Sequence, residues 1–131
     1  MSFFSDFRSL LYEDISKRRK TTPFLIFIFL LVGFTVSRIW VMVFPERGVL
    51  FLRGYHVHHF FYGLVLVVIA GYIALVTDRI RLQRLSAILF GLGTGMMLDE
   101  IGLILTCGTI TKGCDYWSRV TYDIFIVVVS L

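Results

Sequence analysis

The sequence has few charged residues for its length. Only 17% of its 131 residues are charged, whereas 57% are hydrophobic, and the mean hydropathy is +0.83. A small soluble domain exposes too large a share of its surface to hide so much apolar area. The composition therefore excludes an ordinary soluble domain and predicts one integral membrane domain, with the lipid bilayer as its solvent.

Proline is also scarce, and the two prolines flank the first long apolar run. Pro23 is expected at the first helical position, where its missing N–H costs nothing, and Pro45 ends the run. We predict full transmembrane helices at 23–44, 56–76 and 86–106. Each has about 21 residues, which is enough to cross a hydrocarbon core of about 30 Å.

Two further segments complete the predicted architecture. Residues 117–131 reach only about 20 Å at helical rise, so either this helix ends inside the membrane or the natural chain continues. Residues 3–20 combine apolar positions at helical spacing with charged ones, which is typical of an interfacial amphipathic helix. The predicted fold is an all-α integral membrane bundle with three full transmembrane helices and a short or truncated fourth.

The basic residues do not gather on one face, which argues against nucleic acid as a partner despite the net charge of +4. They lie instead at the ends of apolar runs. Residues 17–20 precede the first run, and Arg79, Arg81 and Arg84 separate the second from the third. By the positive-inside rule, this distribution predicts a multi-pass protein of the cell membrane with a cytoplasmic N-terminus.

Cysteine is limited to Cys107 and Cys114, in or beside the second predicted outer loop. The pair would close a small disulfide ring if that side is oxidising, and two free thiols are the alternative. Histidine is limited to one predicted helix, so bis-histidine haem ligation is not expected within one chain. The glycine run at 91–95 lies mid-helix, not in a strand-to-helix turn, so no nucleotide site is expected.

Charged residues within the predicted spans are few, and they lie at similar depth. Asp99 and Arg38 are each about 20 Å from the inner ends of their helices. The other polar residues of this layer lie near the outer membrane edge: His56, His58, His59, Glu100, Arg119 and Asp123. Because charges in a membrane are costly and usually functional or paired, this layer is the candidate site.

Helical spacing predicts how this layer assembles. One face of the second helix carries His56, His59, Gly63 and Ala70, and one face of the third carries Gly91, Gly95, Asp99 and Gly102. If these small faces meet, His59 contacts Asp99, and Glu100 points about 100° away toward another helix. Gly33, Gly71 and Gly102 are also predicted close-packing positions.

A metal site is one interpretation of the layer. Imidazole and carboxylate ligands suit zinc, iron or manganese, and an open coordination position would allow a bound water to attack a lipid-like substrate. In this interpretation the ligands are His56, His59 and Asp99, and Glu100 is the general base. Arg38 or Arg119 would hold an anionic group.

Two other interpretations stay open. The charged groups could neutralise one another in a buried ion-pair network, with Arg119 and Asp123 already at i and i+4. The layer could also serve transport or a proton relay, which would require an oligomer because so few helices leave little room for a pore. The alternative function is therefore a non-catalytic subunit, or a small transporter, in a homo-oligomer or larger membrane complex.

Three sequence blocks carry a resemblance. They are His-Val-His-His-Phe-Phe-Tyr-Gly at 56–63, Gly-Thr-Gly-Met-Met-Leu-Asp-Glu at 93–100 and Asp-Tyr-Trp-Ser at 115–118. The chain resembles a group of small prokaryotic multi-pass membrane proteins in these blocks, from the second helix to the start of the fourth. The resemblance gives weight to the blocks and implies no activity.

Overall fold

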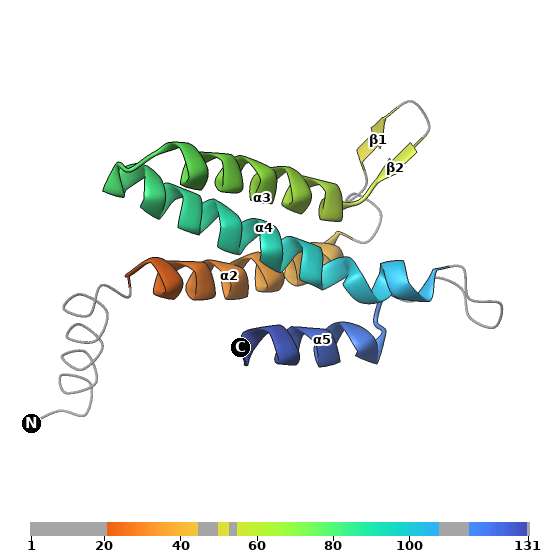
Figure 1. Cartoon of the computed structure of the whole chain (residues 1–131). Coiled ribbons are helices and arrows are strands. Elements are labelled where there is room, and N and C mark those ends of the chain that lie inside the picture. The colour runs from red at the N-terminus through yellow and green to blue at the C-terminus, as the bar shows by residue number, and fades with distance from the viewer. Residues whose placement is uncertain (1–20, 45–49, 53–54, 108–115, 131) are drawn as a thin grey trace, which may run out of the picture.

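The computed structural model describes residues 21–44, 50–52, 55–107 and 116–130 (Figure 1). It contains helices α2 (Thr21–Val43), α3 (His59–Val76), α4 (Ile80–Thr106) and α5 (Arg119–Val129). The predicted interfacial helix at 3–20 lies outside the described residues.

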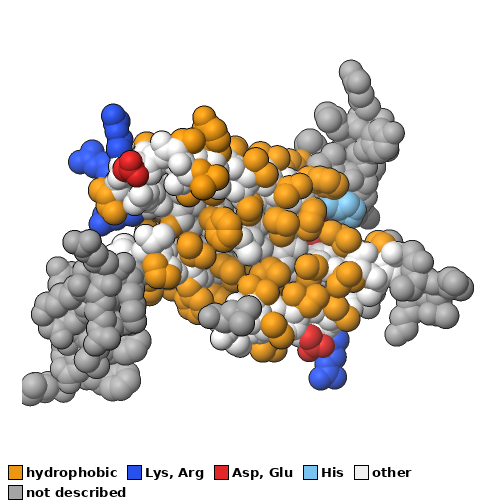
Figure 2. Space-filling model, viewed as in Figure 1, with side chains coloured by type: hydrophobic (Ala, Val, Ile, Leu, Met, Phe, Trp, Pro, Cys, Tyr) orange, Lys and Arg blue, Asp and Glu red, His pale blue; other side chains and the backbone are white. Residues whose placement is uncertain are grey.

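Three of these helices are long and apolar enough to cross a membrane, namely α2, α3 and α4. At helical rise they extend about 35, 27 and 40 Å, whereas α5 extends only about 16 Å. Figure 2 shows hydrophobic side chains along the length of the bundle and charged ones mainly at its ends. The predicted fold class, an all-α membrane bundle with three full spans and a short fourth helix, is confirmed.

All four helices begin at residues other than expected. The differences are two residues for α2, which includes Thr21 and so does not begin at Pro23, and for α5, which begins at Arg119, and they are larger for α3 and α4. A short antiparallel hairpin of β1 (Leu50–Leu52) and β2 (Tyr55–Val57) precedes α3, so this helix begins at His59 and not at residue 56. Helix α4 begins at Ile80, six residues earlier than the predicted 86. The polar residues at its start are compatible with helix, so the apolar run marked only the part of α4 suited to lipid.

Helix α4 is the centre of the bundle and uses glycines on two opposite sides (Figure 1). Gly91 and Gly95 face the backbone of α2, where an added Cβ would overlap Ile26 or Leu30. Gly93 faces Gly63 of α3, and a Cβ at Gly63 would lie 2.6 Å from the Gly93 carbonyl oxygen. Side-chain-free contact on both sides therefore lets three helices approach closely.

This arrangement corrects one sequence-based expectation. The Gly91-x-x-x-Gly95 face was expected to meet the second predicted span, which is α3, but it packs on α2, the first span. At 3.6 residues per turn, Gly93 points nearly opposite to Gly91, and it is Gly93 that meets α3. A pattern of glycines at every second position thus provides two contact surfaces.

Helix α5 packs beside α4 and α2. Gly102 of α4 leaves room for the fully buried Thr121, and the Phe125 ring stacks on Phe34 with ring centroids 4.0 Å apart. The β1–β2 hairpin, the C-terminal part of α4 and the start of α5 lie at one end of the molecule, which we call the hairpin end. The opposite end, where α3 turns into α4 at Arg79, is the arginine end.

Candidate functional site: a polar cluster at the hairpin end

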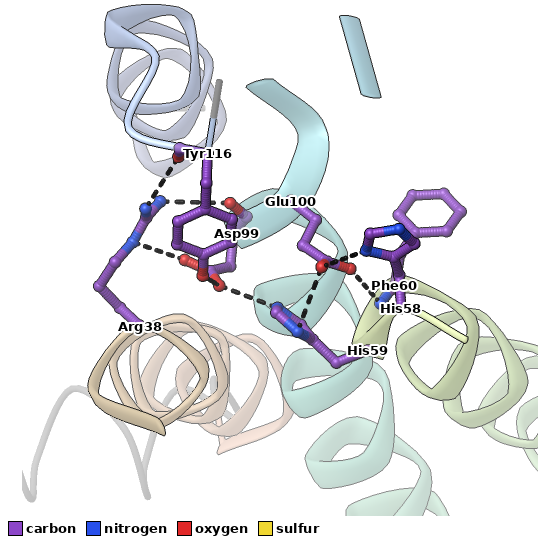
Figure 3. Close-up of polar contacts among 7 residues, drawn as sticks. All are labelled: Arg38, His58, His59, Phe60, Asp99, Glu100 and Tyr116. Carbon is purple, nitrogen blue, oxygen red and sulfur yellow. Dashed lines mark hydrogen bonds and ion pairs between the residues drawn. The ribbon is translucent and has the colours of Figure 1, made fainter. Parts of the chain in front are cut away.

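Polar side chains from three helices and the segment before α5 meet at the hairpin end (Figure 3). We call this group the polar cluster, and its members are Arg38, His58, His59, Asp99, Glu100 and Tyr116. Because Asp99 and Glu100 are consecutive in a helix, their side chains leave α4 about 100° apart. Each carboxylate therefore serves a different set of neighbours.

Asp99 is fully buried at the centre of the cluster. Its Oδ1 lies 2.7 Å from Nε of Arg38, and neither atom has a further hydrogen-bond partner. Its Oδ2 accepts a hydrogen bond from the Tyr116 hydroxyl and lies 2.8 Å from Nε2 of His59. A buried charge without such partners costs several kcal/mol, so Asp99 depends on all three contacts.

Arg38 is buried among groups that suit a guanidinium. Its two terminal nitrogens donate hydrogen bonds to the backbone carbonyls of Asp99 and Tyr116, each at 3.2 Å. The guanidinium carbon also lies 4.5–5.4 Å from the centroids of four aromatic rings: Phe34, Tyr116, Trp117 and Tyr122. Stacking on rings and donation to oxygens together stabilise the cation away from water.

Glu100 caps the start of α3 from a neighbouring helix. Its Oε2 accepts a hydrogen bond of 2.7 Å from the backbone N–H of Phe60, and its Oε1 lies 3.0 Å from Nδ1 of His58. The N-cap residue His58 makes no side-chain cap of its own. A carboxylate at a helix N-terminus pairs with an otherwise unused N–H and with the positive end of the helix dipole.

His59 lies between the two carboxylates. Its Nε2 is 2.8 Å from Asp99 Oδ2, and its Nδ1 is 3.4 Å from Glu100 Oε1. A neutral imidazole donates from one nitrogen only, whereas an imidazolium donates from both. His59 therefore connects the two carboxylates, which leave α4 in different directions.

Tyr116 acts as a neutral donor. Burial, followed by the hydrogen bond to Asp99, raises the pKa of the Tyr116 phenol above its usual value of 10.0. The phenol therefore keeps its proton under all physiological conditions and continues to donate to Asp99.

The structure brings together five residues singled out from the sequence: Arg38, His58, His59, Asp99 and Glu100. The contact between His59 and Asp99 follows the expectation from helical spacing. Glu100 was expected to point toward a helix other than the second predicted one, but it contacts the start of α3, and it is Asp99 that also reaches α2 and Tyr116. His56 lies in β2 and so does not share a helical face with His59, and its side chain is outside the described part of the structure.

Arg119 and Asp123 do not join the cluster. Their side chains are 93% and 63% exposed, and they pair only with each other, at 3.9 Å between Nε and Oδ1. Both residues lie on α5, and their side chains are largely exposed. The depth estimate could not assign the direction of their side chains.

Tyr116 is the cluster member that sequence reasoning missed. As a tyrosine near the predicted outer end of a span, it fits the membrane interface, as does Trp117 beside it. The signal available was its position in the Asp-Tyr-Trp-Ser block, since the other two blocks supply the histidines and the carboxylates of the polar cluster. A phenol next to a turn carries no periodic pattern that would identify its partner.

The polar cluster contains residue types that bind metal ions, namely histidine, aspartate and glutamate. Among residues 21–44, 50–52, 55–107 and 116–130, no group of three or more His, Cys, Asp and Glu side chains is arranged to hold one. The reason is visible in the geometry, because each carboxylate oxygen of Asp99 and Glu100 already has a protein partner.

The predicted disulfide lies at the edge of the described region. Cys107 follows α4 and is disulfide-bonded. Cys114, the other cysteine of the chain, lies outside the described residues.

Comparisons with known proteins give no relative for this arrangement: the chain matches no protein-family model, no curated protein and no solved structure. Any functional argument therefore depends on the contacts of the polar cluster.

Proposed function

We propose that this chain is a non-catalytic membrane protein whose polar cluster fixes the packing of its helices. The observation that carries the proposal is that both carboxylates, Asp99 and Glu100, are already paired with groups of the protein itself. Asp99 connects α2, α3 and the segment before α5, and Glu100 holds the start of α3. Because these charged groups already have protein partners, they are better suited to hold the helices together than to bind a substrate.

The position of the cluster also favours this function over transport. Between Ser86 and Asp99, the buried residues of α4 are small or apolar: Ala87, Gly91, Gly93, Gly95 and Leu98. A proton or ion path across a membrane needs polar groups along its length. In the described helices, the charged groups inside the bundle are concentrated at the hairpin end.

A buried network of this kind also sets helix register. Arg38 and Asp99 come together only if α2 and α4 are aligned along their axes, and the same holds for Glu100 and the first turn of α3. Apolar and glycine contacts alone would tolerate sliding, because lipid tails solvate apolar side chains as well as a neighbouring helix does. The polar contacts add directional constraints.

The metal-site alternative is retained as the competing hypothesis. Its ligands would be His59 and Asp99 together with His56, with Glu100 as base and zinc, iron or manganese as the ion. It requires His59 and Asp99 to exchange their present contacts for a metal. This requirement separates the two hypotheses experimentally.

The test combines elemental analysis with thermal unfolding of the purified full chain in detergent. The protein is measured as isolated, after chelator treatment, and after addition of zinc, iron or manganese. Asp99→Asn is the cluster variant, and Asp123→Asn is the matched control, because it removes the same charge from an exposed site.

A structural cluster gives no stoichiometric metal and an unfolding midpoint that chelator leaves unchanged, with a large loss in Asp99→Asn alone. Stoichiometric metal that disappears in Asp99→Asn, together with chelator sensitivity of the wild type, would overturn the proposal in favour of a metal centre.

A non-catalytic protein of this type acts through the chains it contacts, so a homo-oligomer or a larger membrane complex is part of the proposal. Cross-linking in native membranes, before detergent is added, measures it directly. A chain that stays monomeric there and co-purifies with no other protein argues against a subunit role.

A further inference from the structure

A second concave feature lies at the arginine end, far along α4 from the polar cluster. It is a groove of about 510 Å³, which is within the roughly 300–1,000 Å³ of small-ligand sites. Helix α2 contributes Thr22 and Ile26. The end of α3 contributes Ala70, Gly71, Ala74 and Leu75. The first turns of α4 complete it with Gln83, Ser86, Ala87 and Phe90.

Gly71 distinguishes this groove from the glycine contacts of the bundle. A Cβ added at Gly63, Gly93 or Gly95 would overlap a neighbouring helix, whereas a Cβ at Gly71 would meet nothing within 4 Å. Gly71 is therefore not a packing position, contrary to the expectation from sequence. It opens onto the groove, and its lack of a side chain adds to the space there.

Two polar side chains of the groove, both on α4, are already hydrogen-bonded to the backbone. Ser86 Oγ donates to the carbonyl of Ala70 at 2.7 Å, and Gln83 Nε2 donates to the carbonyl of Thr77 at 3.3 Å. With these groups satisfied, the walls present mainly apolar surface. A groove of this kind in a membrane is suited to a hydrocarbon chain.

Basic side chains lie at the arginine end, beside the first turn of the α4 wall of the groove. Arg79, Arg81 and Arg84 are all exposed, and the acidic residue among the described residues of this end is Asp78. Figure 2 shows these basic side chains gathered where α3 meets α4. Arg79 is the N-cap residue of α4, and its carbonyl oxygen accepts a hydrogen bond of 3.0 Å from the backbone N–H of Gln83, a groove residue. By helical spacing, Arg81 lies on the side of α4 roughly opposite to Gln83 and Ser86.

We infer that this groove binds an anionic phospholipid, with one acyl chain along Gly71 and Ala87 and the headgroup phosphate at Arg79. Any bilayer lipid has an acyl chain that can fill the groove, so the acyl chain does not distinguish one lipid from another. Selectivity comes from the charge at the arginine end, since a basic side chain at the membrane surface attracts anionic headgroups. The positive-inside rule predicts that this end faces the cytoplasm, where anionic lipid is concentrated.

The test uses native mass spectrometry of the full chain released from nanodiscs that contain equal amounts of phosphatidylglycerol and phosphatidylcholine. The expected result for wild type is retention of phosphatidylglycerol in at least severalfold excess. Arg79→Gln is expected to abolish the preference. Arg81→Gln is the matched control, because it removes the same charge at the same end but on the other face of α4.

A steric variant tests the acyl chain independently of charge. Gly71→Leu fills the open space without meeting another helix, so it is expected to fold normally and to lose bound lipid of both kinds. Its thermal unfolding midpoint, measured in parallel, verifies the fold.

Three results would overturn the inference. They are an absence of headgroup preference in wild type, equal loss of the preference in Arg79→Gln and Arg81→Gln, or full lipid retention in a folded Gly71→Leu variant. None of these outcomes bears on the polar cluster, which lies at the hairpin end, so the two proposals succeed or fail separately.

Discussion

The described part of the chain contains two arginine–aspartate pairs in very different surroundings. Arg38 and Asp99 are 9% and 0% exposed, come from different helices and approach to 2.7 Å. Arg119 and Asp123 are 93% and 63% exposed, lie one turn apart on α5 and approach to 3.9 Å. The same two side-chain types therefore give a tertiary contact in one place and a local surface pair in the other.

The difference teaches which pair the fold depends on. In the buried pair, removal of one partner leaves a charge that neither water nor another side chain can compensate. The exposed pair lies at the predicted outer edge of the membrane; where water reaches it, water compensates the remaining charge, and the long side chains regain freedom. Five substitutions test this contrast, beginning with the largest expected effect.

Asp99→Asn is expected to be the most damaging. It keeps the volume of the side chain but removes the charge that compensates Arg38, so we expect a loss of about 3–5 kcal/mol. Thermal or SDS unfolding in detergent measures it. A loss as small as that of an exposed substitution would show that Arg38 finds compensation elsewhere, and the contrast between the two pairs would then fail.

Tyr116→Phe removes one donor to the buried carboxylate and leaves the ring in place. Because the hydrogen bond goes to a charged group, we expect a loss of about 1.5–3 kcal/mol near neutral pH.

The same variant also makes a pH prediction. Since the folded state raises the pKa of the Tyr116 phenol, the stability that this group contributes is complete below pH 10 and decreases as the pH rises above that value. The difference between wild type and Tyr116→Phe, measured from pH 8 to pH 11, should therefore shrink at the alkaline end. A constant difference would contradict it.

Glu100→Gln separates the cap on α3 from the ion pair on α2. The amide oxygen still accepts from the Phe60 N–H, but the charge next to the helix N-terminus and His58 is lost, so we expect a loss of about 0.5–2 kcal/mol. Hydrogen exchange should show the loosening in the first turn of α3. Equal loosening throughout α2 would indicate that the two carboxylates act as one unit.

Arg119→Ala and Asp123→Ala, alone or together, are expected to change the free energy of unfolding by at most about 0.5 kcal/mol. The same unfolding assay measures them, and salt should have little influence on the result. A loss comparable with that of Asp99→Asn would mean that α5 carries a buried contact in the membrane.

Sequence reasoning located the spans well because each depends on composition over about twenty residues. For α2, the positions of the prolines, the apolar length and the flanking charges all predict the same span. It placed the start of α3 too early because a hairpin of three-residue strands leaves too short a pattern to separate from an apolar helix. It placed the start of α4 too late because polar helix was mistaken for loop.

For the candidate site, the sequence supplied the depth of each polar residue and most of the members of the cluster. It could not supply Tyr116, whose partner is decided by how the chain returns after Cys107. It also could not separate Arg38 from Arg119, because depth along a helix is a one-dimensional quantity. The direction of a side chain depends on which neighbour the helix meets.

The sequence by itself thus determined that this chain is a membrane bundle, because lipid is the only solvent that suits so much apolar length. It also indicated that the charged residues within its spans, Arg38, Asp99 and Glu100, lie near one level. Tertiary structure alone decided that Gly91 and Gly95 face α2 while Gly93 faces α3, and that Asp99 and Glu100 serve different neighbours. The physical reason is that helical periodicity fixes angles around one axis, whereas contacts depend on where the other axes lie.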